Sequence, residues 1–163
     1  MKKNSLAVNS IFNVIYKGFT ALFPLITASY IARTLLPEKL GLVSYAQTIV
    51  TYFTTLASLG LPNYGVKYIS NAGNNIAERS KNFFELFTIN GISTSVFLAL
   101  YYSIVNNFTY FQNKRLVLNV MGLLLILNYF NVDWFYQGIE EYRIISVRSI
   151  IVKVLSFVLV VFL

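Results

Sequence analysis

The sequence of 163 residues contains no cysteine and no histidine, and only 12% of its residues are charged. The missing cysteines exclude a disulfide framework, a thiol nucleophile and a cysteine-ligated metal, and the missing histidines remove the commonest general base. The sequence also lacks a glycine-rich phosphate loop and a nucleophile elbow. We therefore expect a protein that is not an enzyme and that uses no metal or cofactor.

The scarcity of charge also argues against a soluble domain, because soluble domains carry about 25% charged residues. Apolar residues make up 56% of the chain, the mean hydropathy is +0.63, and 14 Phe and 12 Tyr exclude intrinsic disorder. Five apolar stretches approach the ~20 residues that cross a bilayer as a helix. The sequence thus predicts an all-α polytopic membrane protein with spans at about 8–32, 40–59, 84–105, 116–136 and 149–163.

The last predicted span is short and runs directly to the end of the chain. One interpretation is a short helix that tilts or thins the bilayer. We favour the other, in which the span is cut short and the chain is the N-terminal part of a longer protein.

Lys and Arg residues at the ends of the spans predict the orientation, because cytoplasmic loops are enriched in them. Four lie on one side, namely Arg33, Lys39, Lys114 and Arg115. Eight lie on the side of the N-terminus, namely Lys2, Lys3, Lys67, Arg79, Lys81, Arg143, Arg148 and Lys153. This difference predicts a cytoplasmic N-terminus. The net charge of +7 then fits anionic membrane lipids, and no nucleic-acid partner is expected.

Polar residues recur at helical spacing inside the first two predicted spans. The first stripe comprises Asn9, Asn13, Lys17, Thr20 and Thr27, and the second comprises Ser44, Thr48, Thr51, Thr55 and Ser58. A polar face within a membrane must meet protein or water. The hydroxyl stripe fits either a cavity wall or helix packing by small residues. Lys17 either snorkels to the cytoplasmic boundary or faces a cavity or an anion, and we favour the latter.

Polar and aromatic side chains gather where the fourth span ends. Asn128, Asn131 and Asp133 precede Trp134, and we interpret the aromatic residues there as an interfacial belt. In the third span, Glu85 is spaced to pair with Lys81 one turn earlier.

Three segments resemble one known family, in the same order and at similar separations. They are YIARTLLPEKLGLVSYAQTIV (30–50), LASLGLPNYGVKYIS (56–70) and DWFYQGIEEYRIISVRSIIVK (133–153). They resemble the polysaccharide-biosynthesis flippases of the Wzx type, in the MOP superfamily, which are related to MATE exporters. The resemblance implies two six-helix lobes that move undecaprenyl-pyrophosphate-linked oligosaccharide across the bacterial inner (plasma) membrane. This chain would supply about five helices of the N-terminal lobe.

The resemblance also implies roles for individual residues. Lys17 would be a cavity cation for the pyrophosphate, with Asn13 and Thr20 beside it and Thr48 and Thr51 on the second helix. A second group, a loop network that shapes a gate, would contain Arg33, Asp133, Glu140, Glu141, Arg143 and Arg148. Arg33 also fits an interfacial anchor, and local ion pairing would equally explain the loop charges.

The expected partners are a lipid-linked oligosaccharide, membrane lipids, and polysaccharide polymerase and assembly proteins. Two alternatives stay open at this point. A fragment of a MATE-like exporter of amphiphiles would favour an acid within the first span, and that span has none. A small membrane scaffold without transport activity would be a stable protein when expressed alone.

Overall fold

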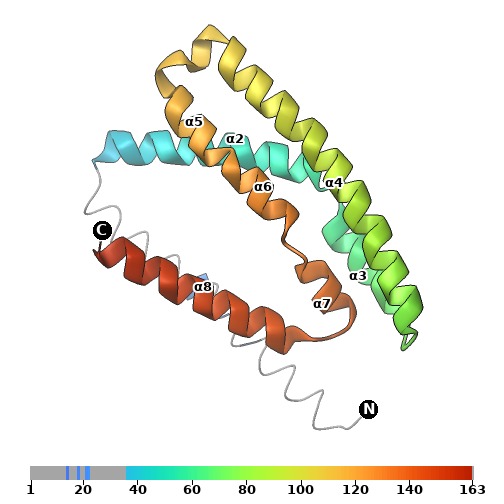
Figure 1. Ribbon diagram of the computed structural model, residues 1–163. Coiled ribbons are helices and arrows are strands. Elements are labelled where there is room, and N and C mark those ends of the chain that lie inside the picture. Colours follow the sequence, from blue (N-terminus) through green and yellow to red (C-terminus); the bar gives the residue numbers. More distant parts are fainter. Residues whose placement is uncertain (1–13, 15–17, 19–20, 23–35, 163) are drawn as a thin grey trace. The chain divides into compact units, whose positions relative to one another are not determined.

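The computed structural model describes Val14, Gly18, Ala21, Leu22 and residues 36–162 (Figure 1). The first predicted span, with Asn13, Lys17, Thr20 and Arg33, lies outside the described residues. Every element from Pro37 onward is helical, which confirms the all-α class for this part of the chain. The elements fall into two units: residues 37–138 form one, and the helix after residue 138 belongs to the other.

The first unit contains a long helix, α4 (Ile76–Asn107), that begins at an N-cap. The Asn75 side chain accepts a hydrogen bond from the Glu78 backbone N–H at 3.2 Å, which satisfies one of the free N–H groups of the first turn. At 1.5 Å per residue, its 32 residues extend about 48 Å. Its charged residues all precede Leu86, so the following 22 residues carry no charge and suffice to cross a bilayer core.

The chain after α4 returns along it through a series of short helices (Figure 1). These are the 3-10 helix η1 (Thr109–Lys114), α5 (Arg115–Met121), α6 (Leu123–Tyr129) and α7 (Asp133–Gly138). Two segments of the described chain, Ile76–Asn107 and Thr109–Gly138, are long and apolar enough to cross a membrane. A count of about five spans stays a prediction.

The break between α5 and α6 coincides with two tyrosine hydroxyls from α4. Tyr101 donates to the Leu118 carbonyl oxygen at 2.6 Å, and Tyr102 donates to the Asn119 carbonyl oxygen at 3.1 Å. The Leu118 carbonyl oxygen also accepts from the Gly122 backbone N–H at 2.8 Å, so the Tyr101 hydroxyl adds a bond there without replacing the backbone one. Gly122 lies in the gap, where an added Cβ would lie 2.7 Å from the ring of Tyr101.

The core of this unit lies between α2 (Pro37–Ala57), α4 and the α5–α6 stretch. Its buried residues are Ala46, Val50, Ala57, Tyr101, Val105, Leu118 and Leu125. Phe53 meets the ring of Tyr101 edge to face, with 5.2 Å between ring centres. Small residues on α2 therefore allow the aromatic side chains of α4 to fill the space between the helices.

At one end of α4, α3 (Leu61–Asn71) packs against α4 and α7. A turn joins α2 to α3, in which Leu59 and Gly60 both have positive φ, at 49° and 73°. The contact between α3 and α7 requires glycine on both helices. An added Cβ at Gly65 would lie 2.6 Å from the ring of Trp134, and one at Gly138 would lie 2.7 Å from Cβ of Ile69.

The other unit contains α8 (Tyr142–Phe162). Glu140, just before it, has φ of 60°, a left-handed conformation that is uncommon for a residue other than glycine. Ile145 and Ser146 are buried on this helix. The Ser146 hydroxyl donates to the Tyr142 carbonyl oxygen at 2.8 Å, so part of its hydrogen bonding stays within the helix.

Candidate functional site

A small polar pocket lies within the first unit, where α2 ends and the helices α3, α4, α6 and α7 meet. We call it the amide pocket; its volume is about 200 Å³. Its lining residues are Ser58, Leu61, Pro62, Asn90, Asn128, Asn131, Asp133, Trp134 and Gln137. Four of these nine residues carry a side-chain amide, which is a high proportion for an apolar chain.

The breaks in the helices bring these amides together. Asn131 lies in the non-helical step between α6 and α7, where its Oδ1 accepts from the Asp133 backbone N–H at 3.2 Å. That bond starts α7 and turns Asp133 and Gln137 toward the end of α6, which carries Asn128. Asn90, which is only 8% exposed, comes from the middle of α4.

Much of the hydrogen-bonding capacity in the amide pocket is unused by the described protein atoms. Asn90 accepts from the Thr94 hydroxyl at 3.5 Å, which leaves its Nδ2 group without a partner in the described chain. The amides of Asn128 and Gln137 have no partner there at all. None of these amide atoms is among the fully buried atoms without a partner, so water or a ligand can reach them. The pocket is therefore suited to a ligand or water that donates and accepts hydrogen bonds.

The pocket wall also includes the single tryptophan of the chain. The Trp134 side chain is buried at 5% exposure and stacks on Phe83, with 5.6 Å between ring centres and 21° between ring planes. Trp134 therefore packs inside its unit and connects α7 to α3 and α4. An interfacial belt formed by the aromatic residues after the fourth span stays a prediction.

A second polar surface runs along α2, and we call it the hydroxyl stripe: Ser44, Thr48, Thr51, Thr55 and Ser58. Each hydroxyl after Ser44 donates to a carbonyl oxygen of its own helix at 2.8–2.9 Å. Thr48 lies two residues from both Ala46 and Val50, which places it about 200° around the helix from each. Thr48, Thr51 and Thr55 are exposed, and the stripe thus faces away from the core of its unit.

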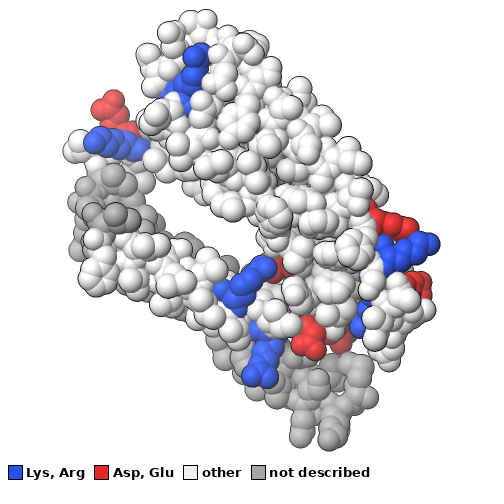
Figure 2. Space-filling view, in the orientation of Figure 1, with Lys and Arg blue, Asp and Glu red and all other residues white. Residues whose placement is uncertain are grey.

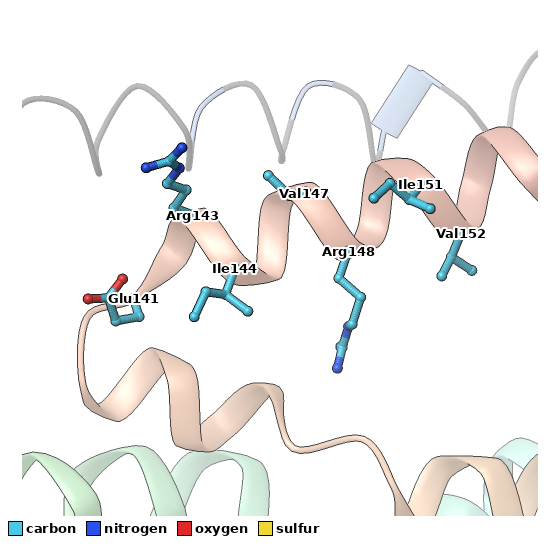
Figure 3. Close-up of a pocket in the computed structure, with 7 residues that line it drawn as sticks. All are labelled: Glu141, Arg143, Ile144, Val147, Arg148, Ile151 and Val152. Atoms are coloured by element: carbon cyan, nitrogen blue, oxygen red, sulfur yellow. The ribbon is translucent and has the colours of Figure 1, made fainter.

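Three charged residues of the expected gate network lie along one groove on α8 and its approach (Figure 3). Glu141, Arg143 and Arg148 line this open groove of about 710 Å³ together with Ile144, Val147, Ile151 and Val152. In Figure 3, Arg143 points to the same side of the helix as Val147, and Arg148 points to the side of Ile144. Glu140 lies in the preceding turn, and Asp133 lines the amide pocket of the other unit.

A cluster of hydrogen bonds joins α3 to the start of α4. The Tyr68 hydroxyl donates to Glu85 at 3.2 Å, and the Asn82 amide donates to the Tyr68 carbonyl oxygen at 3.3 Å. Lys81 and Glu85 form the expected ion pair, with 3.9 Å between nitrogen and oxygen. The hydrogen bond to Glu85, followed by the charge of that carboxylate, raises the pKa of Tyr68.

The opposite end of the unit carries its own charged surface. Lys114 places its ammonium group 4.5 Å from the ring centre of Tyr45, and Glu38 and Lys39 line the same shallow hollow. In Figure 2 the charged side chains of this unit gather toward its ends, and a wide uncharged surface separates them. This distribution is the one that a membrane-crossing unit requires, because charges avoid the bilayer core.

Sequence reasoning selected only part of what the structure brings together. Thr48 and Thr51 lie on the exposed hydroxyl stripe, as a cavity wall would require, and Asp133 lies in the amide pocket. Asn90, Asn128, Asn131 and Gln137 were not among the predicted site residues. The sequence holds a signal for two of them. Asn128 and Asn131 are three residues apart in an otherwise apolar stretch, just before Asp133. In the described residues, no group of three acidic, histidine or cysteine side chains could hold a metal ion.

Comparison with known proteins gives one match. The family model for polysaccharide biosynthesis proteins matches residues 6–163. No curated protein and no solved structure matches the chain significantly. The family match extends over all three segments whose resemblance was noted in the sequence. The amide pocket, the hydroxyl stripe and the α8 groove all lie within the matched residues. Because the match covers nearly the whole chain, the chain belongs to the polysaccharide biosynthesis protein family.

Proposed function

We propose that this protein takes part in moving lipid-linked oligosaccharide repeat units across the bacterial plasma membrane. In this proposal the chain is a Wzx-type member of the MOP superfamily and contributes about five helices of an N-terminal lobe. Its N-terminus is cytoplasmic. Its ligand carries an undecaprenyl pyrophosphate, and its partners include polysaccharide polymerase and assembly proteins.

The observation that carries the proposal is the outward-facing hydroxyl stripe of α2. Each of its hydroxyls from Thr48 to Ser58 donates its only proton to the helix backbone, so outwardly the stripe offers oxygen lone pairs. Such a surface accepts hydrogen bonds from water, sugar hydroxyls or an ammonium group. Lipid tails have no donors, and a cavity wall therefore fits this face better than a lipid-facing surface does.

The proposed roles of single residues are those that the family resemblance implies. Thr48 and Thr51 would face the head group of the ligand, and Lys17 would supply the positive charge that a pyrophosphate requires. Asn13 and Thr20 would flank Lys17 as hydrogen-bonding groups. The gate network would comprise Arg33, Asp133, Glu140, Glu141, Arg143 and Arg148. Alternating access would then depend on the cytoplasmic loops that hold most of these charges.

The test replaces Thr48, Thr51 and Thr55 together by Val, which keeps side-chain shape but removes the hydroxyl oxygens. In cells that depend on this gene, we expect several-fold less surface polysaccharide and an accumulation of lipid-linked repeat units. Membrane abundance of the variant should be unchanged, because the helix keeps its backbone bonds. Thr88→Val, at another exposed threonine on α4, is the matched control.

Normal surface polysaccharide in the triple variant would contradict a cavity role for the stripe. Lys17→Ala should independently reduce surface polysaccharide at unchanged abundance. If neither change has an effect and the 163-residue chain is a stable, protease-resistant protein on its own, the scaffold alternative is the better explanation.

A further inference from the structure

We propose that the amide pocket is a binding subsite for a single sugar residue. The pocket shares Ser58 with the end of the hydroxyl stripe but differs from the stripe in its chemistry, because it offers donors as well as acceptors. The inference rests on the proposed function in one respect only, the choice of a sugar among polyhydroxyl ligands. Its other supports are the hydrogen-bonding state, charge and size of the pocket.

The hydrogen-bonding state of the lining selects a ligand with hydroxyl groups. The oxygens of Asn90 and Asn131 are already bonded to Thr94 and to the Asp133 N–H, which leaves their Nδ2 groups as donors to the pocket. Asn128 and Gln137 offer both a donor and an acceptor. A sugar hydroxyl donates and accepts at once, so it can use both kinds of group. A bare cation would use only the oxygens of the lining and would leave the N–H donors without partners.

The charge of the lining excludes an anionic ligand such as a phosphate. No lysine or arginine lines the pocket, and its one ionisable side chain is the acid Asp133. The lipid pyrophosphate therefore has no favourable site here. A neutral sugar avoids this electrostatic conflict.

The size of the pocket limits the ligand to about one sugar ring. Its volume of about 200 Å³ equals that of roughly six or seven water molecules, at ~30 Å³ each. An oligosaccharide would not fit, although the pocket opens to the surface and further sugars could extend outward. Leu61, Pro62 and the edge of Trp134 give the pocket an apolar side for the C–H groups of the ring. Phe83 stacks on the Trp134 ring and Gly65 lies against its six-membered part, so a ligand would contact the part of the ring that they leave open.

Trp134 makes the pocket directly measurable, because it is the only tryptophan among the 163 residues. The purified 163-residue chain in detergent micelles is titrated with glucose, galactose and N-acetylglucosamine while its tryptophan emission is recorded. Glycine betaine at equal osmolality corrects for solvent effects. We expect a saturable change in emission for at least one sugar, with a Kd on the order of millimolar, as expected for a few hydrogen bonds.

Two variants assign the response to the pocket. Asn128→Leu removes an unused amide at similar volume and should weaken sugar binding at least tenfold. Asn113→Leu removes an exposed amide in η1 and should leave binding unchanged. Circular dichroism checks that each variant is folded. If Asn128→Leu does not fold, Gln137→Leu, which changes a partly exposed residue, takes its place.

Three results would overturn the inference. The emission change could be absent for all sugars, which would identify a water-filled pocket, or it could be unaffected by Asn128→Leu. It could also occur with sodium chloride but not with choline chloride or sugars, which would identify a cation site. Each result concerns binding in micelles, and is therefore independent of whether the Thr48, Thr51 and Thr55 variants affect polysaccharide export. If export depends on the hydroxyl stripe but the pocket binds no sugar, only this inference is overturned and the proposed function stands.

Discussion

Trp134 on α7 lies directly against Gly65 on α3, so closely that an added Cβ on the glycine would be 2.6 Å from the indole ring. Real Cβ atoms essentially never approach another heavy atom at this distance. Phe83 of α4 also stacks on the indole, with 5.6 Å between ring centres. This contact joins three helices and forms one wall of the amide pocket, so packing at Gly65 and binding at the pocket are linked through one side chain.

Gly65→Ala should therefore destabilise the protein by about 1–3 kcal/mol, the usual cost of overpacking a filled site. The displaced indole should also shift the tryptophan emission, which reports on this position alone. Gly41→Ala is the matched control, because an added Cβ there meets nothing within 4 Å. In a helix interior that change should stabilise by about 0.5–1 kcal/mol. Equal unfolding temperatures for both variants would contradict the close contact at Gly65.

The helix boundaries show which features the sequence could predict. The predicted third span began at residue 84, but α4 begins at Ile76, because its charged first turns remain helical where they are exposed. Hydropathy detects the apolar part of such a helix and misses the charged extension. α2 ends at Ala57, before the positive φ values of Leu59 and Gly60. The left-handed conformation of Leu59 has no sequence signal.

The amide pocket was less predictable than the helices. Its residues come from four helices and two connecting segments, and their convergence depends on the break after Tyr129. Periodicity did not reveal this break, because the apolar pattern continues through it. The stretch 116–136, predicted as one span, lies within the apolar segment Thr109–Gly138, and the short helices α5, α6 and α7 follow one another along that segment. The tyrosine hydroxyls of α4 that accompany the first break lie 17 residues away in sequence, and no local pattern could indicate them.

Tyr101→Phe tests the contact between α4 and α5. The Tyr101 hydroxyl is buried and donates to the Leu118 carbonyl oxygen, which also accepts from the Gly122 N–H at 2.8 Å. Because that carbonyl keeps its backbone donor, we expect a loss of only about 0.5–1.5 kcal/mol in unfolding free energy. Tyr52→Phe, at an exposed tyrosine on α2, should change stability by less than about 0.5 kcal/mol. A chemical unfolding series in detergent measures both, and an equal effect of the two changes would contradict the buried hydrogen bond.

The link between Tyr68 and Glu85 predicts a pH effect. The hydrogen bond to Glu85 raises the pKa of Tyr68 above its usual value of about 10. A raised folded-state pKa contributes stability that is fully present below pH ~10 and is lost as the pH rises through the raised value. Glu85→Gln should therefore lower the pKa of Tyr68 toward its usual value. Carbon NMR of labelled tyrosine, with Tyr68→Phe for assignment, measures the shift, and Glu38→Gln at the far end should leave it unchanged.

The absence of cysteine gives a direct test of how the first unit crosses the membrane. The turn before α4 and the 3-10 helix η1 after it lie at opposite ends of a helix about 48 Å long. With the N-terminus in the cytoplasm, η1 should face outward, because the flanking Lys39, Lys114 and Arg115 belong to the side with fewer positive charges. In intact cells, an impermeant maleimide should label Asn113→Cys but should label Asn74→Cys only after permeabilisation. Labelling of Asn74→Cys alone would reverse the orientation. Labelling of both sites in intact cells would show that α4 does not cross the membrane, and would remove the structural basis of the proposed transport function.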